Sequence, residues 1–359
     1  MNDATVRLGY VGCGFMAQNA HLPNFSSIPG CRLVALAERR PRLAEAVADR
    51  YAIERIYESH HQLAEDPAVD AVALSAAFAE QGEIAADLLH AGKHVFMEKP
   101  MAVSVAQAER ILEAARAGGS RLMVAYMKRY DPGNMLAQSR IAAWRTDGSR
   151  GPVLYARNHG FGGNWLVGLD TSGMITTDEA AEVMDASHLM PSWLPSAGGE
   201  GYIWYLQQWT HNINLLRFLL GTGDEARVRA VDLDADGMTG LVVLDLGGTR
   251  AVVESAQSQH HGWDEHTQVY FEKGWVRLAA EPMFYRPSRS SVEFYTAGEM
   301  PTYEEPDPGC PAAWPYREEA VAFIEALRSG EEFRSSGEDT LTDVRLCEQI
   351  YRMYLGVES

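Results

Sequence analysis

The sequence predicts an α/β protein built from two domains. Its 359 residues exceed the usual length of a single domain. Over residues 6–126, short apolar runs alternate with helical stretches, which is the pattern of a parallel sheet with crossover helices. Over residues 227–297, strand-like runs follow one another with no long helix between them, which predicts a mostly antiparallel sheet. We therefore expect one domain at residues 1–126 and a second at residues 127–359.

Five strands with helical stretches between them are expected in the first domain. The strand candidates are the short β-rich runs Val6–Val11, Arg32–Ala37, Ala71–Ser75, His94–Met97 and Leu122–Tyr126. The helical stretches between them are Arg42–Tyr51, Glu80–Ala91 and Val105–Ala117. Ser104 followed three residues later by Gln107 resembles a capping box, and Gly118-Gly119 suits a helix stop.

The pattern changes after Tyr130, and Asp131-Pro132-Gly133 is a break near the start of the second domain. A helix is expected at about 134–144, a long loop at 163–203 and a further helix at about 203–220. A loop of that length inside a compact chain is often functional. The remaining elements, in chain order, are strands Val228–Leu233, Gly240–Leu246, Ala251–Gln257, Thr267–Glu272 and Gly274–Leu278 and helices 315–329 and 338–355. Packing of the C-terminal helix back on the first domain is kept as an alternative.

Composition and charge exclude several classes of protein. The net charge of −18 argues against a nucleic-acid partner, whose phosphates would be repelled. It permits a cationic ligand, although an acidic surface that only maintains solubility is the more frequent explanation of such a charge. No apolar run approaches the ~18 residues of a membrane helix, and the N-terminus has no signal-peptide pattern. The cysteines lack metal-ligand spacing and predict reduced thiols in the cytoplasm; they are Cys13, Cys31, Cys310 and Cys347.

A glycine motif follows the first strand candidate. The residues are Gly12-Cys13-Gly14-Phe15-Met16-Ala17, a GxGxxA pattern between a strand and a helix. Gly12 suits a tight turn, Gly14 lets a pyrophosphate approach the backbone, and Ala17 lets the helix pack on the sheet. Free N–H groups at the start of the helix then face the phosphates. This motif predicts a Rossmann dinucleotide-binding domain, with Cys13, Phe15 and Met16 also lining the cofactor.

An acidic residue accompanies this motif at the end of the second strand candidate. Glu38 stands where a carboxylate is expected to bind the adenosine ribose hydroxyls. Ser75, at the end of the third strand candidate, is a further expected cofactor contact. Glu38 disfavours a 2′-phosphate, whereas Arg39 and Arg40 could pair with one. NAD is therefore the preferred cofactor, and NADP stays open.

Glu98-Lys99-Pro100 follows the strand candidate His94–Met97. Ligands of open α/β sheets bind at the carboxyl ends of strands, which places Glu98 and Lys99 beside the cofactor. A lysine there can hydrogen-bond a substrate hydroxyl and stabilise alkoxide character. By spacing alone, a surface Glu-Lys pair that ends a strand is the more frequent explanation.

Several motifs together resemble one family. They are the GxGxxA turn, the run Ala91–Pro100, Arg129-Tyr130, and the C-terminal stretches 335–339 and 344–351. The chain resembles the Gfo/Idh/MocA family, the relatives of glucose–fructose oxidoreductase and inositol dehydrogenase. The resemblance implies a Rossmann domain followed by an α/β domain with a large open sheet that serves homodimer or homotetramer contacts. It also implies sugar-like or cyclitol-like substrates and a catalytic lysine at Lys99.

The helix at 203–220 carries a polar stripe. Gln207, His211 and Asn214 fall at i, i+4 and i+7 and share one face. Buried polar groups left unpaired cost about 1–3 kcal/mol, so this face needs partners, which either a substrate cleft or neighbouring backbone groups can supply. The family resemblance implies that His211 is catalytic. Gln207 and Asn214 stand where the family usually has acids, so both are expected to bind the substrate, Gln207 by hydrogen bonding, and His211 is expected to stay neutral.

Further candidates for the substrate site are Lys128, Asn158 and His159. Lys128 occupies the first basic position of the family's Met-Arg-Arg-Tyr-like run, and the other two follow a strand-like run. A structural role is an equal alternative for all three. The family's Thr-Pro-Asn…His pattern is absent, and Ala76-Ala77-Phe78 and Gln81 stand in its place.

The resulting hypothesis is oxidation of a secondary alcohol on a sugar, cyclitol, glycoside or aminosugar (aminoglycoside) intermediate, or the reverse reduction. Hydride passes between the substrate carbon and the nicotinamide, His211 acts as general base and Lys99 polarises the oxygen. Both side chains are expected to converge on one alcohol, and no metal is required. The alternatives are an NAD-dependent glycosidase or epimerase that works through a transient ketone, and a non-catalytic NAD-bound sugar sensor.

Overall fold

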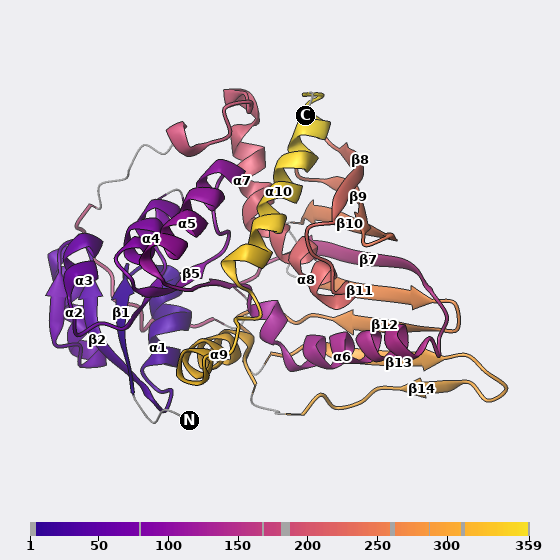
Figure 1. Cartoon of the computed structure of the whole chain (residues 1–359), viewed down its shortest axis with the longest axis horizontal. Helices are drawn as coiled ribbons and strands as arrows, with labels where there is room; N and C mark the ends of the chain where they lie inside the picture. Colours follow the sequence, from indigo (N-terminus) through magenta and orange to yellow (C-terminus); the bar gives the residue numbers. More distant parts are fainter. Residues whose placement is uncertain are drawn as a thin grey trace. The chain divides into compact units, whose positions relative to one another are not determined.

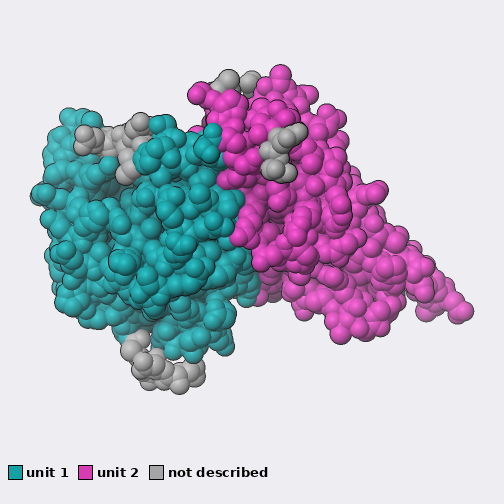
Figure 2. Space-filling view, turned by 45° about the horizontal axis from the view of Figure 1, so that its top comes forward, with its two compact units in different colours: residues 1–126, 170–192, 316–341 teal, residues 127–169, 193–315, 342–359 magenta. Residues whose placement is uncertain are grey.

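The computed structural model describes residues 5–78, 80–166, 169–180, 187–258, 263–286, 288–309 and 313–357. Two compact units make up the chain, coloured separately in Figure 2. The first unit contains the described residues up to Tyr126 together with Asp170–Ser192 and Tyr316–Leu341. The sequence-based boundary assigns 170–192 and 316–341 to the second domain, whereas the structure groups both segments with the first. Cys310 lies outside the described residues.

A six-stranded parallel sheet forms the centre of the first unit (Figure 1). Its strands are β1 (Val6–Val11), β2 (Cys31–Ala37), β3 (Arg55–Tyr57), β4 (Ala71–Leu74), β5 (His94–Glu98) and β6 (Leu122–Ala125). The strand order is β3-β2-β1-β4-β5-β6, so the direction of progression reverses between β1 and β4. Ligands of open α/β sheets bind at such a reversal, outside the carboxyl ends of the strands. The predicted parallel sheet is confirmed, and β1, β4 and β5 end at the same edge.

Helices connect these strands at nearly the predicted positions. The predicted ones are α2 (Pro41–Tyr51), α4 (Gln81–His90) and α5 (Val105–Gly118). A further helix, α3 (His60–Glu65), lies between β3 and β4, and α9 (Pro315–Ser329) comes later in the chain. The capping box before α5 forms, because the Ser104 hydroxyl accepts the Gln107 N–H and the Gln107 amide oxygen accepts the Val103 N–H. Gly119 ends α5 with φ +62°, as a left-handed cap. β3 and α3 were not predicted, since three and six residues give too little periodicity.

The helix after β1 contains a π-helical segment, η1 (Ala17–His21), followed by α1 (Leu22–Phe25). Pro23 has no N–H to donate within this helix. Just before Pro23 the hydrogen bonds change to the π-helical pattern, and the Leu22 N–H donates to the Ala17 carbonyl, five residues back. Such segments occur frequently at functional sites. Here the segment includes His21, whose side chain is fully buried.

An eight-stranded sheet forms the second unit (Figure 1). Its strands are β7 (Val153–Gly162), β8 (Arg227–Leu233), β9 (Gly240–Leu246), β10 (Thr249–Gln257), β11 (Asp264–Phe271), β12 (Gly274–Ala279), β13 (Ser291–Thr296) and β14 (Thr302–Glu304). The order is β14-β13-β12-β11-β7-β10-β9-β8, and only the β10–β7 pairing is parallel. Helix α6 (Pro132–Asp147) packs on β12 and β13, and α8 (Thr210–Leu220) packs on β7 and β10. The expectation of an open, mostly antiparallel sheet is confirmed.

Further helices lie in the second unit. They are η2 (Met127–Tyr130), η4 (Ser196–Gly198), α7 (Gly199–Gln208) and most of α10 (Gly337–Tyr354), while η3 (Ser187–Leu189) belongs to the first unit. The single helix expected at 203–220 is two helices that meet at Trp209, and it begins four residues earlier than predicted. The Trp209 indole N–H donates to the Gly160 carbonyl at 3.2 Å, which fastens this junction to β7. Among the described residues, no helix has the length and apolar composition of a membrane span.

Candidate functional site

The glycine turn has the backbone geometry that a dinucleotide site requires. Gly12 has φ +89°, and a Cβ there would lie 2.4 Å from the Ser75 carbonyl oxygen at the end of β4. A Cβ at Gly14 would meet nothing within 4 Å among the described atoms. Gly12 is therefore needed by the fold, whereas the open space over Gly14 is available to a ligand.

Paired alanine substitutions should separate these two roles. Gly12→Ala is expected to destabilise the first unit by about 1–3 kcal/mol from the backbone conformation alone, with the clash in addition. Gly14→Ala is expected to preserve the melting temperature but to raise the dissociation constant of NAD roughly tenfold or more, ~1.4 kcal/mol. Thermal melts and calorimetric NAD titrations measure both effects. Tight NAD binding by Gly14→Ala would contradict the assignment of this turn.

Glu38 follows β2 and is held in place by the glycine turn. Its Oε2 accepts the Cys13 N–H at 2.8 Å, and its Oε1 accepts the Arg40 N–H at 3.1 Å. The Arg40 guanidinium adds two bonds, at 2.8 and 3.0 Å. Burial raises the pKa of Glu38, but the bonds from Arg40 and Cys13 outweigh it and hold this pKa below its usual range. The carboxylate thus stays charged beside the turn, and Arg40 partly neutralises it.

The other predicted cofactor residues gather around the same edge. Arg39 forms an ion pair with Glu80, at the start of α4, with an N–O distance of 2.9 Å. The Ser75 hydroxyl lies 2.9 Å from the Tyr10 hydroxyl. Phe15 and Met16 open the helix after the turn and are half-buried. Burial, followed by the charge of Glu38, raises the pKa of the Cys13 thiol, so Cys13 contributes its backbone and not a thiolate.

A segment that the sequence assigned to the second domain borders this edge. The Gln18 side chain donates to the Cys13 carbonyl and exchanges two hydrogen bonds with the backbone of Ile175, at 2.8 and 2.9 Å. The Glu179 carboxylate accepts the N–H groups of Arg42 and Leu43, at 3.2 and 3.3 Å. It therefore satisfies donors in the first turn of α2, which would otherwise be available to an anion.

The Glu-Lys-Pro turn after β5 is clamped from two sides. The buried Glu98 carboxylate lies 2.7 Å from Nε2 of His21 and accepts the Lys99 N–H at 3.1 Å. The Gln81 amide donates to the carbonyls of Glu98 and Pro100, at 3.0 and 2.8 Å. Lys99 is half-buried, and its peptide bond to Pro100 is cis. The sequence did not predict that His21 and Gln81 hold this turn. The position of Gln81, in place of the absent family pattern, could have indicated its role.

A second carboxyl group lies near Glu98 and was also missed. Glu319 of α9 has no exposed surface, and neither of its carboxyl oxygens has a hydrogen-bond partner among the described residues. Burial first, and then the charge of Glu98, raises its pKa well above the usual range. Burial therefore favours the protonated form of Glu319. No sequence signal could have found this proximity, because more than 200 residues separate the two carboxyl groups.

The predicted catalytic histidine stands next to the junction of α7 and α8. His211 is the second residue of α8 and is buried, and Gln207, one turn earlier, is half-buried. Helical hydrogen bonds continue through Trp209, from its N–H to Tyr205 and from Ile213 to its carbonyl. Gln207 and His211 are therefore still one turn apart, as the i, i+4 spacing predicts.

Lys128 and Asn158 meet in one polar network beneath α8. The Lys128 ammonium pairs with the buried Glu265 carboxylate, which also accepts a hydrogen bond from Asn212 at 3.2 Å. Asn212 donates to Asn158 at 2.6 Å, and Asn158 donates to the Thr267 hydroxyl at 2.7 Å. Each of these groups already has a protein partner, so the network fixes η2 and α8 on the sheet.

Asn214 belongs to a different buried network. Its amide oxygen accepts a bond from Arg129 at 2.7 Å, and its amide nitrogen donates to Asp343 of α10 at 2.6 Å. Asp343 also pairs with Arg217 at 2.8 Å, and neither side chain of this pair has exposed surface. The structure thus gives Asn214 a bridging position between an arginine and a carboxylate.

His159 lies on the opposite face of the sheet from Asn158. Successive residues of a strand point to opposite faces. His159 Nδ1 is 2.6 Å from Glu254 on β10, and its ring stacks on His266 of β11 with centroids 4.7 Å apart. The structure therefore does not bring His159 together with Asn158, Lys128 and His211.

A parallel sheet with this strand order, a glycine turn at its reversal point and a carboxylate after β2 define a Rossmann dinucleotide-binding protein. Residues 6–126 match GFO_IDH_MocA, an oxidoreductase family with an NAD-binding Rossmann fold. Within the first unit, residues 6–126 therefore form a domain that is similar to the NAD-binding Rossmann domain of this oxidoreductase family.

Known proteins extend the similarity beyond this domain. Inositol 2-dehydrogenase of Salmonella typhimurium is 35% identical over 132 residues, which cover 36% of this chain and 39% of that protein. The chain therefore spans well under half of this relative in the alignment. Myo-inositol 2-dehydrogenase of Thermotoga maritima is 24% identical over 356 residues, which cover 93% of this chain and 92% of that protein. The crystal structure of an aldose-aldose oxidoreductase from Caulobacter crescentus complexed with glycerol has a TM-score of 0.73 at 25% identity and covers 98% of both chains.

Proposed function

We propose that this protein is an NAD(P)-dependent oxidoreductase that oxidises a secondary alcohol of a sugar or cyclitol, or reduces the corresponding ketone. The proposal depends on one observation: β1, β4 and β5 are adjacent strands of one parallel sheet. Gly12, Ser75 and Lys99 follow the ends of these strands. Lys99 therefore follows a strand end at the edge where ligands of such sheets bind, which supports its assignment to the reacting oxygen. The relatives named as inositol dehydrogenases support the same class of substrate.

Two side chains carry the proposed chemistry. Lys99 hydrogen-bonds the reacting oxygen and stabilises negative charge as hydride leaves the adjacent carbon. His211, in its neutral form, accepts the hydroxyl proton as general base. The nicotinamide supplies the hydride acceptor when bound. Glu98, held by His21 and Gln81, fixes the turn from which Lys99 extends.

The preferred cofactor of this proposal is NAD. A 2′-phosphate in the first turn of α2 would approach the Glu179 carboxylate, which already accepts two N–H groups there. Arg40, the nearest cation to Glu38, is bound to Glu38 by three hydrogen bonds. Both features disfavour the extra phosphate of NADP.

Neutralising Glu179 should therefore improve NADP binding. Glu179→Gln is expected to lower the dissociation constant of NADP about fivefold or more, since unit charges 4 Å apart in water interact by ~1 kcal/mol. The NAD constant should change little. Asp178→Asn is the matched control, because Asp178 is strongly exposed and pairs with α2 through the Arg42 side chain. Fluorescence titrations with both cofactors measure the ratio, and an equal gain in the control would contradict the assignment.

The activity itself is tested by absorbance at 340 nm. Purified protein is supplied with NAD or NADP and a panel of inositols, aldoses, neutral glycosides and aminosugars. We expect NADH production with at least one polyol or sugar. Activity on neutral compounds alone would remove the cationic substrates. Cofactor recycling without net NADH would favour the epimerase or glycosidase alternative, and tight NAD binding without turnover on any member would favour the sensor.

The proposal includes a cytoplasmic location and a homodimer or homotetramer joined through the eight-stranded sheet. The acidic composition and the scattered thiols support the location. We propose that the subunits meet at the face of that sheet opposite α6 and α8. His159, Glu254 and His266 lie on this face.

A further inference from the structure

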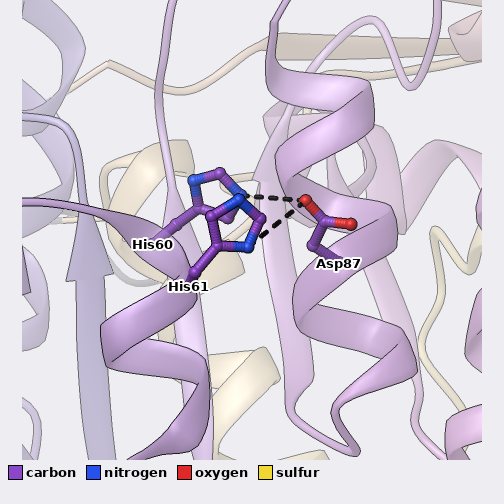
Figure 3. Close-up of side chains that lie close together, drawn as sticks. All are labelled: His60, His61 and Asp87. Atoms are coloured by element: carbon purple, nitrogen blue, oxygen red, sulfur yellow. Dashed lines mark hydrogen bonds and ion pairs between the residues drawn. The ribbon is translucent and has the colours of Figure 1, made fainter.

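Two adjacent histidines and an aspartate lie close together on the first unit. His60 and His61 begin α3, and Asp87 lies in the neighbouring helix α4 (Figure 3). Nε2 of His60 is 3.0 Å and Nδ1 of His61 is 3.8 Å from the same oxygen of Asp87. The imidazole rings are 4.0 Å apart between centroids, with a tilt of 39°. The three ligand atoms all lie within 4.8 Å of one another.

These separations suit a small divalent ion. Bonds of about 2.0–2.2 Å from nitrogen and oxygen ligands place neighbouring ligand atoms about 3.0–3.5 Å apart around one ion. The two measured distances to Asp87 bracket this range, so small side-chain rotations suffice. Asp87 and His61 are half and two-thirds exposed, which leaves room for water to complete the coordination. The surrounding backbone is fixed, because the Ser59 hydroxyl caps α3 and α3 packs on α4.

We propose that His60, His61 and Asp87 form a binding site for a divalent transition-metal ion of the Zn²⁺ class. Imidazole nitrogens select Zn²⁺, Co²⁺, Ni²⁺ or Cu²⁺ over Mg²⁺ and Ca²⁺, which prefer sites made only of oxygen ligands. Two neutral imidazoles and one carboxylate give the site a net charge of −1, in a protein whose overall charge is −18. The ion joins α3 to α4 and acts independently of the proposed hydride transfer.

A second histidine cluster fits a cation less well. His159, Asp264 and His266 also bring their ligand atoms together. The Arg157 guanidinium, however, lies 2.6 Å from Nε2 of His266, and Glu254 occupies Nδ1 of His159. A fixed positive charge at that distance opposes a metal ion. This cluster is therefore useful as an internal control.

The test uses the full chain after treatment with a chelator and exhaustive dialysis. Calorimetric titration with Zn²⁺ alone is expected to give one equivalent of binding. Titration with Co²⁺ should give visible d–d absorption without the strong thiolate band of a cysteine ligand. An ion that binds only the folded protein also stabilises it, so the melting temperature of the first unit should rise with Zn²⁺ concentration.

Single substitutions localise the ion. Asp87→Asn and His61→Ala, both at exposed side chains, are each expected to weaken Zn²⁺ binding at least tenfold and to abolish the Co²⁺ spectrum. His266→Ala tests the second cluster, and His90→Ala, an exposed histidine near the end of α4, tests non-specific imidazole binding. Both controls should bind as the wild type does. Wild-type affinity in Asp87→Asn and His61→Ala, or absence of any binding equivalent, would overturn the proposal.

Discussion

Replacing Lys99 with methionine is expected to lower turnover by roughly 10²–10³-fold while NAD binding persists. Loss of one preorganised donor to a developing oxyanion has an effect of about this size. Methionine retains the length of the side chain and removes the charge. The fold should survive, because Gln81 and His21 hold the turn through the backbone and through Glu98. Steady-state rates at 340 nm, on the best substrate from the panel, measure the loss.

Two comparisons make the result specific to the site. Lys273→Met removes an exposed lysine of the β11–β12 turn and should leave turnover unchanged. His211→Gln should reduce turnover by roughly 10²–10⁴-fold, the usual contribution of a general base. It should also flatten the pH dependence of kcat. Full activity of Lys99→Met would refute the proposed chemistry, and full activity of His211→Gln alone would mean that another group takes the proton.

Asp343→Ala is expected to destabilise the second unit by about 3–5 kcal/mol, because it leaves the Arg217 guanidinium buried without its carboxylate. Asn214 would lose its acceptor in the same step, and Arg129 would lose the support that Asn214 transmits. For a unit of this size the loss corresponds to a fall in Tm of roughly 6–20 °C. Differential scanning calorimetry of the full chain measures it.

A surface ion pair provides the matched comparison. Asp245 pairs with Arg229, whose side chain is 63% exposed. Such pairs contribute about 0–1 kcal/mol, so Asp245→Ala should change Tm by only a few degrees. Asp343→Asn should lie between the two alanine variants, since its amide oxygen still accepts a hydrogen bond. Equal stability of Asp343→Ala and Asp245→Ala would show that the buried network contributes little.

The sheet of the first unit was predictable because its signals are local. Each strand from β1 to β6 except β3 is an apolar run bounded by turn residues. The glycine turn and the Ser104–Gln107 capping box also depend on residues close together in sequence. For the same reason the junction at Trp209 was not predictable. Both flanking helices share one continuous helical pattern, and the junction is fixed by a contact with Gly160, 49 residues away.

The site was predictable only in part, since sequence motifs identify residues but not their partners. Glu38 was placed correctly after β2, but nothing local predicts that Arg40 folds back on it. Lys128 and Asn158 are polar residues that a cleft could use, and the structure gives them Glu265 and Thr267 as partners. Successive side chains of a strand point to opposite faces of the sheet, which separates Asn158 from His159. This could be predicted only if the strand were known to include both residues.

The first unit is assembled from segments that lie far apart in the chain, and this affects how the chain folds during synthesis. Its sheet ends by residue 125, yet Phe323 of α9 packs on Phe25 and Phe96, and the Ser335 hydroxyl and carbonyl bond the backbone of Val124. These late segments emerge from the ribosome after the whole eight-stranded sheet. Phe25 and Phe96 therefore lack this partner until α9 has been synthesised, and a fragment that stops at residue 126 is expected to aggregate more readily than the full chain.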